Sequence, residues 1–386
     1  MVRWPLQSIR RRIPTPASVT GAVQSPAVVT RLGLFLGPAF GVCFLTGLIS
    51  HNAQSPTGVL LRPWPVWGYR LTQGIHVATG IACLPLLLAK IFAAYPRILD
   101  RPDGPARGPS VIIRFAAGRL LIGILTAAGI VQVATGLFNI FQWYVFTFDF
   151  VPVHYAVAWV AMGAILIHVA TKLPTIIETL RRRRRTGQRH SPGARRGFIG
   201  GVLGVAGGLT IFSIGQTIGP LNGLALLSPR RPRSVNLQGV PINRTAAQAG
   251  VVDRIDSWSL TITGPSGEHT LHRDTLTAMP QATVRLPIAC VEGWSVSAEW
   301  SGVRIKDLVD LVGGAGRDLR VQSMERGSRY ARTRLPADFV ADPRSILAIR
   351  INGEVLALDH GYPARIIAPD RPGALQTKWV ERLEVL

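Results

Sequence analysis

Five long apolar stretches constrain this chain more than any other feature of its sequence. A helix needs about 20 mostly apolar residues to cross a bilayer. Stretches of this kind lie at 32–50, 71–95, 115–137, 152–173 and 198–219. The aromatic segment 138–151 is too short to cross and is typical of a membrane interface. We therefore predict a bundle of five transmembrane helices.

The net charge of +22 is distributed unevenly along the chain. Residues 1–235 hold 25 Lys and Arg against 4 Asp and Glu, whereas residues 236–386 hold 18 against 17. An excess confined to segments between apolar stretches is typical of membrane topology, and it argues against a nucleic-acid footprint. Most of these arginines lie in the N-terminal tail and in the loops near 96–114 and 174–197.

The side that carries this arginine excess predicts the orientation of the chain. The loops on the opposite side hold only Arg62 and Arg70. Because cytoplasmic loops are the basic ones, we predict a multi-pass protein of a bacterial cell membrane, in contact with lipid. Five spans then place the C-terminal domain outside the cytoplasm.

Arg195 and Arg196 directly precede the fifth stretch and are followed by Gly197, Phe198 and Ile199. A pair of arginines before a Gly-rich, mildly apolar helix resembles a twin-arginine export signal. A domain that receives a bulky cofactor in the cytoplasm must cross the membrane folded, which favours the twin-arginine export machinery as a partner. The alternative is that the two arginines only anchor a helix end.

Ionisable side chains inside a membrane are costly and mark functional sites. Four histidines lie in or at the edges of the stretches: His51, His76, His154 and His168. His154 and His168 are 14 residues apart, so on one helix they share a face and lie roughly 21 Å apart along its axis. This spacing suits two haem irons at two depths of the bilayer.

A haem with two histidine ligands takes the second one from another helix at the same depth. His76 lies in the outer half of the second stretch and is the predicted partner of His154. Fourteen residues after His76 the chain has Lys90, so His168 has no evident partner. His51, at the outer end of the first stretch, fits a haem propionate, a quinone site or a simple helix cap, and these remain open.

This arrangement of histidines resembles the cytochrome b subunits of formate dehydrogenases and nickel hydrogenases, over residues 30–175. The resemblance implies haem b and electron exchange with the quinone pool. Those subunits carry a further histidine on their first helix near the cytoplasm, and this chain has none there. One haem b is therefore expected, and a second is left open.

Beyond residue 235 the composition becomes that of a soluble α/β domain. Strands are expected at 259–263, 282–289, 346–351 and 364–368, and a short amphipathic helix at 302–313. There is no Gly-rich dinucleotide fingerprint, no Ser-His-Asp order and no CxxC cluster. The chemistry of this domain must therefore come from another motif.

Cys290 is the only cysteine of this domain, at the end of a predicted strand and before a polar turn. A thiolate in such a place can bind a soft metal. The alternative is a buried structural cysteine, which is the interpretation we give to Cys43 and Cys83 in the apolar stretches.

The residues around Cys290 decide between these alternatives by resemblance. The runs 286–295 (LPIACVEGWS) and 299–303 (EWSGV) are similar to the sulfite oxidase and methionine sulfoxide reductase type of molybdopterin-binding domain, over residues 240–386. The resemblance implies that Cys290 is the catalytic cysteine and ligates molybdenum. It also implies contacts with the cofactor from Asn243, Arg244, His360, Arg365, Gly373 and Lys378.

Two of these residues also fit the cofactor on chemical grounds. Arg365 and Lys378 suit a phosphate, although a surface ion pair is the alternative for each. The sulfoxide reductases have asparagine where His360 stands, so the substrate is left open. The arginine-rich loop 323–334 is expected to border the pocket, either to receive an oxyanion or as a solvated basic face.

The sequence thus predicts a multi-domain chain, an all-α transmembrane bundle followed by an α/β sulfite-oxidase-type domain. The predicted parts are a basic cytoplasmic tail (1–31), a cytochrome b-like four-helix domain (32–175), an Arg-rich cytoplasmic loop (176–197), a fifth helix (198–219), a linker (220–239) and the molybdopterin domain (240–386).

The predicted function is a molybdenum-dependent oxidoreductase. Electrons would pass between quinone, haem b and an extracytoplasmic molybdenum centre, which would reduce a small S-oxide or N-oxide by oxygen-atom transfer. One alternative is a sulfite dehydrogenase that feeds electrons into the membrane. Another is a non-catalytic membrane electron-transfer protein whose soluble domain has lost its metal, against which the intact Cys290 argues.

Overall fold

The computed structural model describes residues 21–55, 62–99, 109–143, 145–185, 192–230 and 237–386. The chain forms two compact units. The first comprises Met1–Phe44, Thr79–Asn139 and Trp143–Thr210, and the second comprises Leu45–Ala78, Ile140–Gln142 and Ile211–Leu386. The second unit therefore contains the soluble domain together with one end of four apolar helices.

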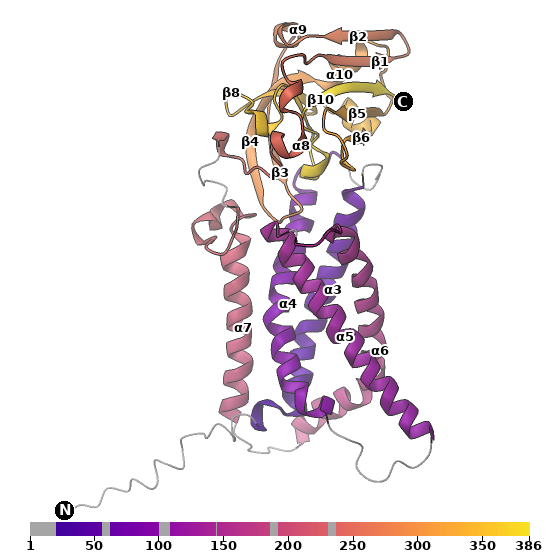
Figure 1. Cartoon of the computed structure of the whole chain (residues 1–386). Helices are drawn as coiled ribbons and strands as arrows, with labels where there is room; N and C mark the ends of the chain where they lie inside the picture. The colour runs from indigo at the N-terminus through magenta and orange to yellow at the C-terminus, as the bar shows by residue number, and fades with distance from the viewer. Residues whose placement is uncertain (1–20, 56–61, 100–108, 144, 186–191, 231–236) are drawn as a thin grey trace, which may run out of the picture. The chain divides into compact units, whose positions relative to one another are not determined.

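Five long helices correspond to the five predicted apolar stretches (Figure 1). They are α3 (Pro26–Ala53), α4 (Gly68–Leu99), α5 (Pro109–Phe141), α6 (Phe150–Arg185) and α7 (Pro192–Ile214). Each contains a segment long and apolar enough to cross a membrane. Large apolar side chains such as Leu45, Leu120 and Leu166 are exposed on them, as expected of helices that face lipid. The five-span prediction is confirmed.

The helices extend beyond the apolar stretches. Residues 138–141 continue α5, and residues 176–185, expected in a loop, continue α6. Leucine and arginine are good helix formers, so the basic run prolongs α6 rather than ending it. Arg195 and Arg196 lie near the start of α7. The side chains 182–185, like most of the predicted N-terminal tail, lie outside the described residues.

The soluble domain is built on two five-stranded sheets. The first has the order β2-β1-β10-β5-β6, with β2 at Gly267–Leu271, β1 at Leu260–Gly264, β10 at Val380–Val385, β5 at Leu319–Ser323 and β6 at Arg332–Leu335. The second has the order β3-β4-β7-β8, with β9 also paired to β7; its strands are Ala282–Ala289, Ser295–Arg304, Ile346–Ile351, Glu354–Val355 and Arg365–Ile367.

Short helices connect these strands. The α-helices are α8 (Ala246–Ala249), α9 (Arg273–Ala278), α10 (Ile305–Asp310) and α11 (Ala337–Ala341). The 3-10 helices are η1 (Gly219–Leu224), η2 (Leu237–Gly239), η3 (Val252–Arg254), η4 (Leu358–His360) and η5 (Gly373–Leu375). The strands expected at 282–289 and 346–351 have these bounds in the structure, which confirms the α/β fold class.

The predicted helix 302–313 is shorter than expected because β4 runs through Arg304. A Cβ on Gly302 would collide with the carbonyl of Leu347 on β7, where the ladder between β4 and β7 shifts register. Gly302 therefore lies at an irregularity of the ladder where the backbones of β4 and β7 approach closely. The helix begins only after it, at Ile305.

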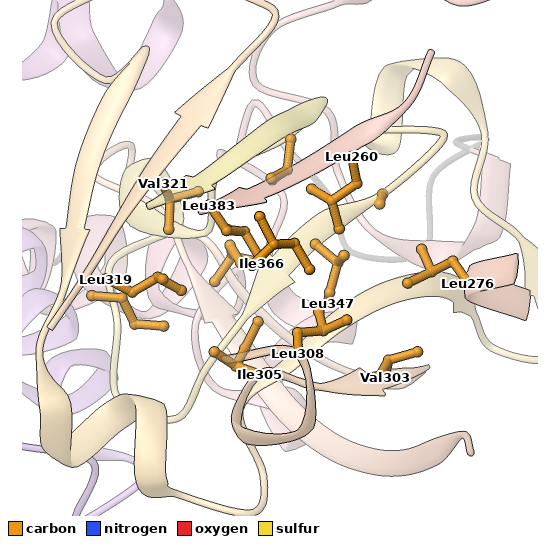
Figure 2. Close-up of a cluster of buried hydrophobic side chains, with 14 of the residues drawn as sticks. Leu260, Leu276, Val303, Ile305, Leu308, Leu319, Val321, Leu347, Ile366 and Leu383 are labelled. Atoms are coloured by element: carbon orange, nitrogen blue, oxygen red, sulfur yellow. The ribbon is translucent and has the colours of Figure 1, made fainter. Parts of the chain in front are cut away.

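Strand β7 is buried on both of its faces. Successive side chains of a strand point to opposite faces of the sheet, so the two faces contribute to two different clusters. Leu347 and Ile349 join the core cluster that Figure 2 shows, together with Leu260 and Leu383 of the first sheet. Ile346 and Ala348 point to a second cluster, around Leu286 and Trp300. The buried central strand β7 supports β4 and, through it, β3, and β3 ends directly before Cys290.

Candidate active site

Cys290 begins a tight turn, residues 290–294, between β3 and β4. Its amide donates to the Trp294 carbonyl at 2.9 Å, and the Gly293 amide donates back to the Cys290 carbonyl at 3.0 Å. Gly293 has a φ of 91°, a value that favours glycine. Only 2% of Cys290 is exposed, so the turn presents the thiol inside the domain and not to solvent.

Burial, followed by the nearby Glu292 carboxylate, raises the pKa of the Cys290 thiol, and Lys378 opposes the shift. Without a metal this thiol is protonated at neutral pH. A metal that binds it must displace the proton, and a strongly bound soft metal can do so.

Arg365, the first residue of β9, is a buried cation near this turn. Its exposed fraction is 2%, and its guanidinium donates to the carbonyls of His360 at 2.9 Å and Gln376 at 3.1 Å. Its Nε has no hydrogen-bond partner among the described residues. Burial lowers the pKa of Arg365 to about 9, because no carboxylate compensates the desolvated charge.

Lys378 adds a second cation to the same place. Its Nζ donates to the carbonyls of Arg244 at 2.9 Å and Asp359 at 2.8 Å. Burial, followed by the charge of Arg365, lowers its pKa to about 7. Neither cation forms an ion pair with a carboxylate in the described part of the chain, so the pair favours a bound anion.

The sequence interpretation missed a third cation, Arg371, which is 5% exposed. Its Nη2 donates to the Arg334 carbonyl at 3.1 Å, and its Nε has no partner among the described residues. Burial lowers its pKa to about 10. The only sequence signal was its place two residues before Gly373, in a segment already assigned to the cofactor.

Gly373 lies against the backbone at Cys290. A Cβ added to it would sit 3.2 Å from the Ala289 carbonyl oxygen and 3.6 Å from Cys290 Cα. The neighbouring Pro372 forms a parallel bridge with Ala289. Glycine is needed here for close approach, and this contact brings the segment with the cations to the thiol.

The remaining predicted contacts lie beside this set. The Arg244 guanidinium pairs with Glu325 at 2.6 Å, while its carbonyl binds Lys378. His360 is buried in η4, with its carbonyl bound to Arg365. The Asn243 carbonyl accepts from Gln142 Nε2 at 3.2 Å. The structure thus gathers the residues predicted in the soluble domain, although Arg244 already has a carboxylate partner.

A second network, also missed from the sequence, surrounds Glu292. This buried carboxylate accepts from Gln142 Nε2 at 2.5 Å and from Trp294 Nε1 at 3.0 Å, and Arg230 lies 3.7 Å away. Arg230 also donates to the side chain of Gln142. Burial raises the pKa of Glu292. The network fixes the 290–294 turn through Glu292 and Trp294.

Two of the membrane histidines, His76 and His154, each lie beside a helical glycine. A Cβ on Gly47 would lie 2.9 Å from the His76 ring, and one on Gly136 would lie 3.5 Å from the His154 ring. His154 Nδ1 also lies 2.9 Å from Thr135 Oγ1. His76 and His154 belong to different units, so their pairing stays a prediction.

The other membrane candidates are less complete. His168 lies on α6, which is one continuous helix from His154 onward. A Cβ on Gly33 of α3 would lie 2.6 Å from Lys90 Nζ. Lys90, which stands where a second histidine ligand would follow His76, therefore reaches α3. His51 lies in the last turn of α3. No group of three metal-binding side chains occurs among the described residues.

Comparison with known proteins decides the nature of the soluble part. Residues 247–386 match the oxidoreductase molybdopterin binding domain family. This part of the chain is a molybdopterin-binding domain. The single buried thiol of Cys290, beside the buried cations Arg365 and Lys378, agrees with this match.

Curated relatives match parts of the chain. A sulfite oxidase of Arabidopsis thaliana is 27% identical over 35% of this chain and 44% of its own length. A mitochondrial sulfite oxidase of Drosophila melanogaster is 30% identical over 34% of this chain and 27% of its own length. YedZ1 of Azospira oryzae, a putative protein-methionine-sulfoxide reductase subunit, is 29% identical over 41% of this chain and 61% of its own length. The chain thus spans less than two thirds of each.

Three observations show that the residues present suit a molybdopterin cofactor. Arg365 and Arg371 each leave a buried Nε without a partner among the described residues, Lys378 lacks a carboxylate partner there, and Gly373 keeps the space beside Cys290 free of a side chain. Cys290 would ligate the molybdenum, and the cations would hold the phosphate and pterin.

Proposed function

We propose that this chain is a membrane-bound molybdenum-dependent oxidoreductase that reduces S-oxides or N-oxides outside the cytoplasm. Electrons come from the quinone pool through haem b. The observation that carries the proposal is the buried Cys290 thiol beside cations without acidic partners, in a domain of the molybdopterin family. The likeness to a putative methionine sulfoxide reductase subunit supports the choice of substrate class.

The bound molybdenum centre supplies two-electron oxygen-atom transfer. Reduction of one S-oxide breaks the sulfur–oxygen bond, consumes two electrons and two protons and releases one water. The residues of this chain bind and orient: Cys290 fixes the metal, while Arg365 and Lys378 hold the anionic part of the cofactor. The hydrogen-bonded 290–294 turn keeps the thiol from solvent.

His76 and His154 are the proposed ligands of one haem b. An ionisable imidazole inside an apolar helix is costly and marks a functional site, and Gly47 and Gly136 leave room for the His76 and His154 rings between helices. His168 is the candidate for a second haem, and His51 for a quinone or propionate contact. Arg195 and Arg196 are the proposed export signal.

Metal analysis tests the proposal directly. We expect purified wild-type protein to contain molybdenum in about equimolar amount and to show b-type haem absorption, because both ligand sets are intact. A Cys290→Ser variant should keep the haem and lose S-oxide reduction, since serine is a poor ligand for a soft metal. Cys43→Ser is the matched control. Wild-type protein without molybdenum would favour the non-catalytic alternative.

Sulfite oxidation is the second candidate, because two of the relatives are sulfite oxidases. The exposed arginines Arg326, Arg329 and Arg332 also fit an oxyanion substrate. The direction of electron flow separates the candidates. S-oxides should oxidise a pre-reduced haem, whereas sulfite should reduce an oxidised one, and the change in haem absorbance reports both.

A further inference from the structure

The turn that carries Cys290 is held by residues from outside the molybdopterin domain. Gln73 lies on α4 and donates from Nε2 to the Val291 carbonyl at 3.0 Å. Thr217, just after α7, donates from its hydroxyl to the Gly293 carbonyl. The Ser295 amide donates to the Gln216 carbonyl at 2.9 Å. All of these residues belong to the same compact unit.

Further contacts hold the 290–294 turn in place. The Arg70 guanidinium, also on α4, donates through two nitrogens to the Thr217 carbonyl, at 3.2 and 2.6 Å. A Cβ on Gly293 would lie 2.9 Å from Val77 and 3.0 Å from the Gln216 side chain. The turn therefore fits closely against α4 and the segment after α7, with no space for another side chain.

A glutamine at position 73 does not favour the stability of the fold. Gln73 is 5% exposed, and its Oε1 has no hydrogen-bond partner among the described residues. A buried amide with one group unsatisfied is less favourable than an apolar side chain of similar shape. What the amide provides is its single donated bond, made to the residue next to Cys290.

We propose that Gln73 is a positioning residue that holds the Cys290 turn in the geometry required for metal ligation. His76 follows three residues later, so Gln73 and His76 are neighbours along one side of α4. The outer end of α4 thus serves the molybdenum ligand and, resting on the proposed function, the haem ligand as well.

Two variants test the positioning role. Gln73→Met keeps the length and apolar bulk of the side chain and removes the donor, and Thr217→Val removes the second bond at a similar shape. The matched control is Gln322→Met on β5, which removes one amide bond to Glu381 and leaves the turn intact. All proteins are compared as full-length chains in detergent.

The first measurement uses protein made in cells that lack the molybdenum cofactor. We expect the Gly293 and Ser295 amides to exchange hydrogen about fivefold faster in Gln73→Met, the change expected for one lost hydrogen bond. The same direction is expected in Thr217→Val. Exchange equal to that of the wild type and of Gln322→Met overturns the proposal, whether or not the chain binds molybdenum.

The second measurement uses metal-loaded protein and separates positioning from general stability. We expect Gln73→Met to retain molybdenum and haem but to shift the cysteine-to-molybdenum charge-transfer band and the electron paramagnetic resonance signal of the metal. Gln322→Met should leave both unchanged. An unshifted signal in Gln73→Met also overturns the proposal. Absence of molybdenum from the wild type would instead refute the proposed function and leave the exchange result decisive here.

Discussion

At the scale of single residues, Lys378 is the cation of the site whose charge changes most readily. Its pKa of about 7 reflects burial and the nearby Arg365. A bound anion favours the charged ammonium and raises this pKa. The contribution of Lys378 to anion binding is therefore complete below pH 7, and it is lost as the pH rises through the higher pKa of the bound state.

We expect the chain to release its phosphate-bearing cofactor more readily at alkaline pH. A Lys378→Met variant should bind the cofactor about tenfold more weakly at pH 6, the effect of losing one charged hydrogen-bond donor, and should show a flatter pH dependence. Molybdenum content after dialysis at several pH values measures both. Lys306→Met, an exposed lysine on α10, is the control. Parallel pH profiles for Lys378→Met and wild type would contradict this role.

At the scale of elements, the start of α4 is capped by the molybdopterin domain. Asp370 accepts a hydrogen bond from the Tyr69 amide at 2.5 Å, and burial raises the pKa of this carboxyl to about 6. A helix start favours a negative charge, but desolvation outweighs that effect. Since the folded pKa lies above the ordinary value, folding is favoured while Asp370 is protonated, and stability falls as the pH rises from about 4 through 6.

An Asp370→Asn variant should lose this part of the pH dependence, because the amide oxygen can still accept the bond and carries no charge. We expect the fall in Tm between pH 4 and pH 7 to be smaller in Asp370→Asn than in wild type. Asp256→Asn, at an exposed position, is the control and should follow the wild type. An equal fall in all three proteins would show that Asp370 does not titrate in this range.

At the scale of the whole molecule, Arg195 and Arg196 are the proposed export signal for the molybdopterin domain. Basic residues in the first turn of a helix oppose its dipole, and Arg195 leaves its Nε buried without a partner among the described residues. The two arginines are therefore not explained by a contribution to the stability of α7. We expect a double Arg195→Lys, Arg196→Lys variant to retain the domain in the cytoplasm, as measured by protease accessibility in spheroplasts. Arg181→Lys is the control, and unchanged export of the double variant would refute the signal.

The sequence predicts what depends on periodicity and on local motifs. Apolar length predicted α3 to α7, and strand patterns located β3 and β7. Contacts between distant segments follow from neither kind of pattern. Gln73 and Val291 are 218 positions apart, and nothing near either residue indicates the other. Arg371 was missed for a related reason, since an arginine reveals its burial only when the fold encloses it.

The parallel pairing of β1 with β10 has a consequence for the order of events in the cell. Thr261 pairs with Arg382, so the first strand of the domain has no partner on that side until the ribosome has released residues up to Val385. The apolar helices precede these residues and emerge first. Membrane insertion of the early helices can therefore begin during translation, while completion of this sheet must wait until β10 has been made. Under the proposed export route, the last crossing therefore has to follow the synthesis and pairing of β10.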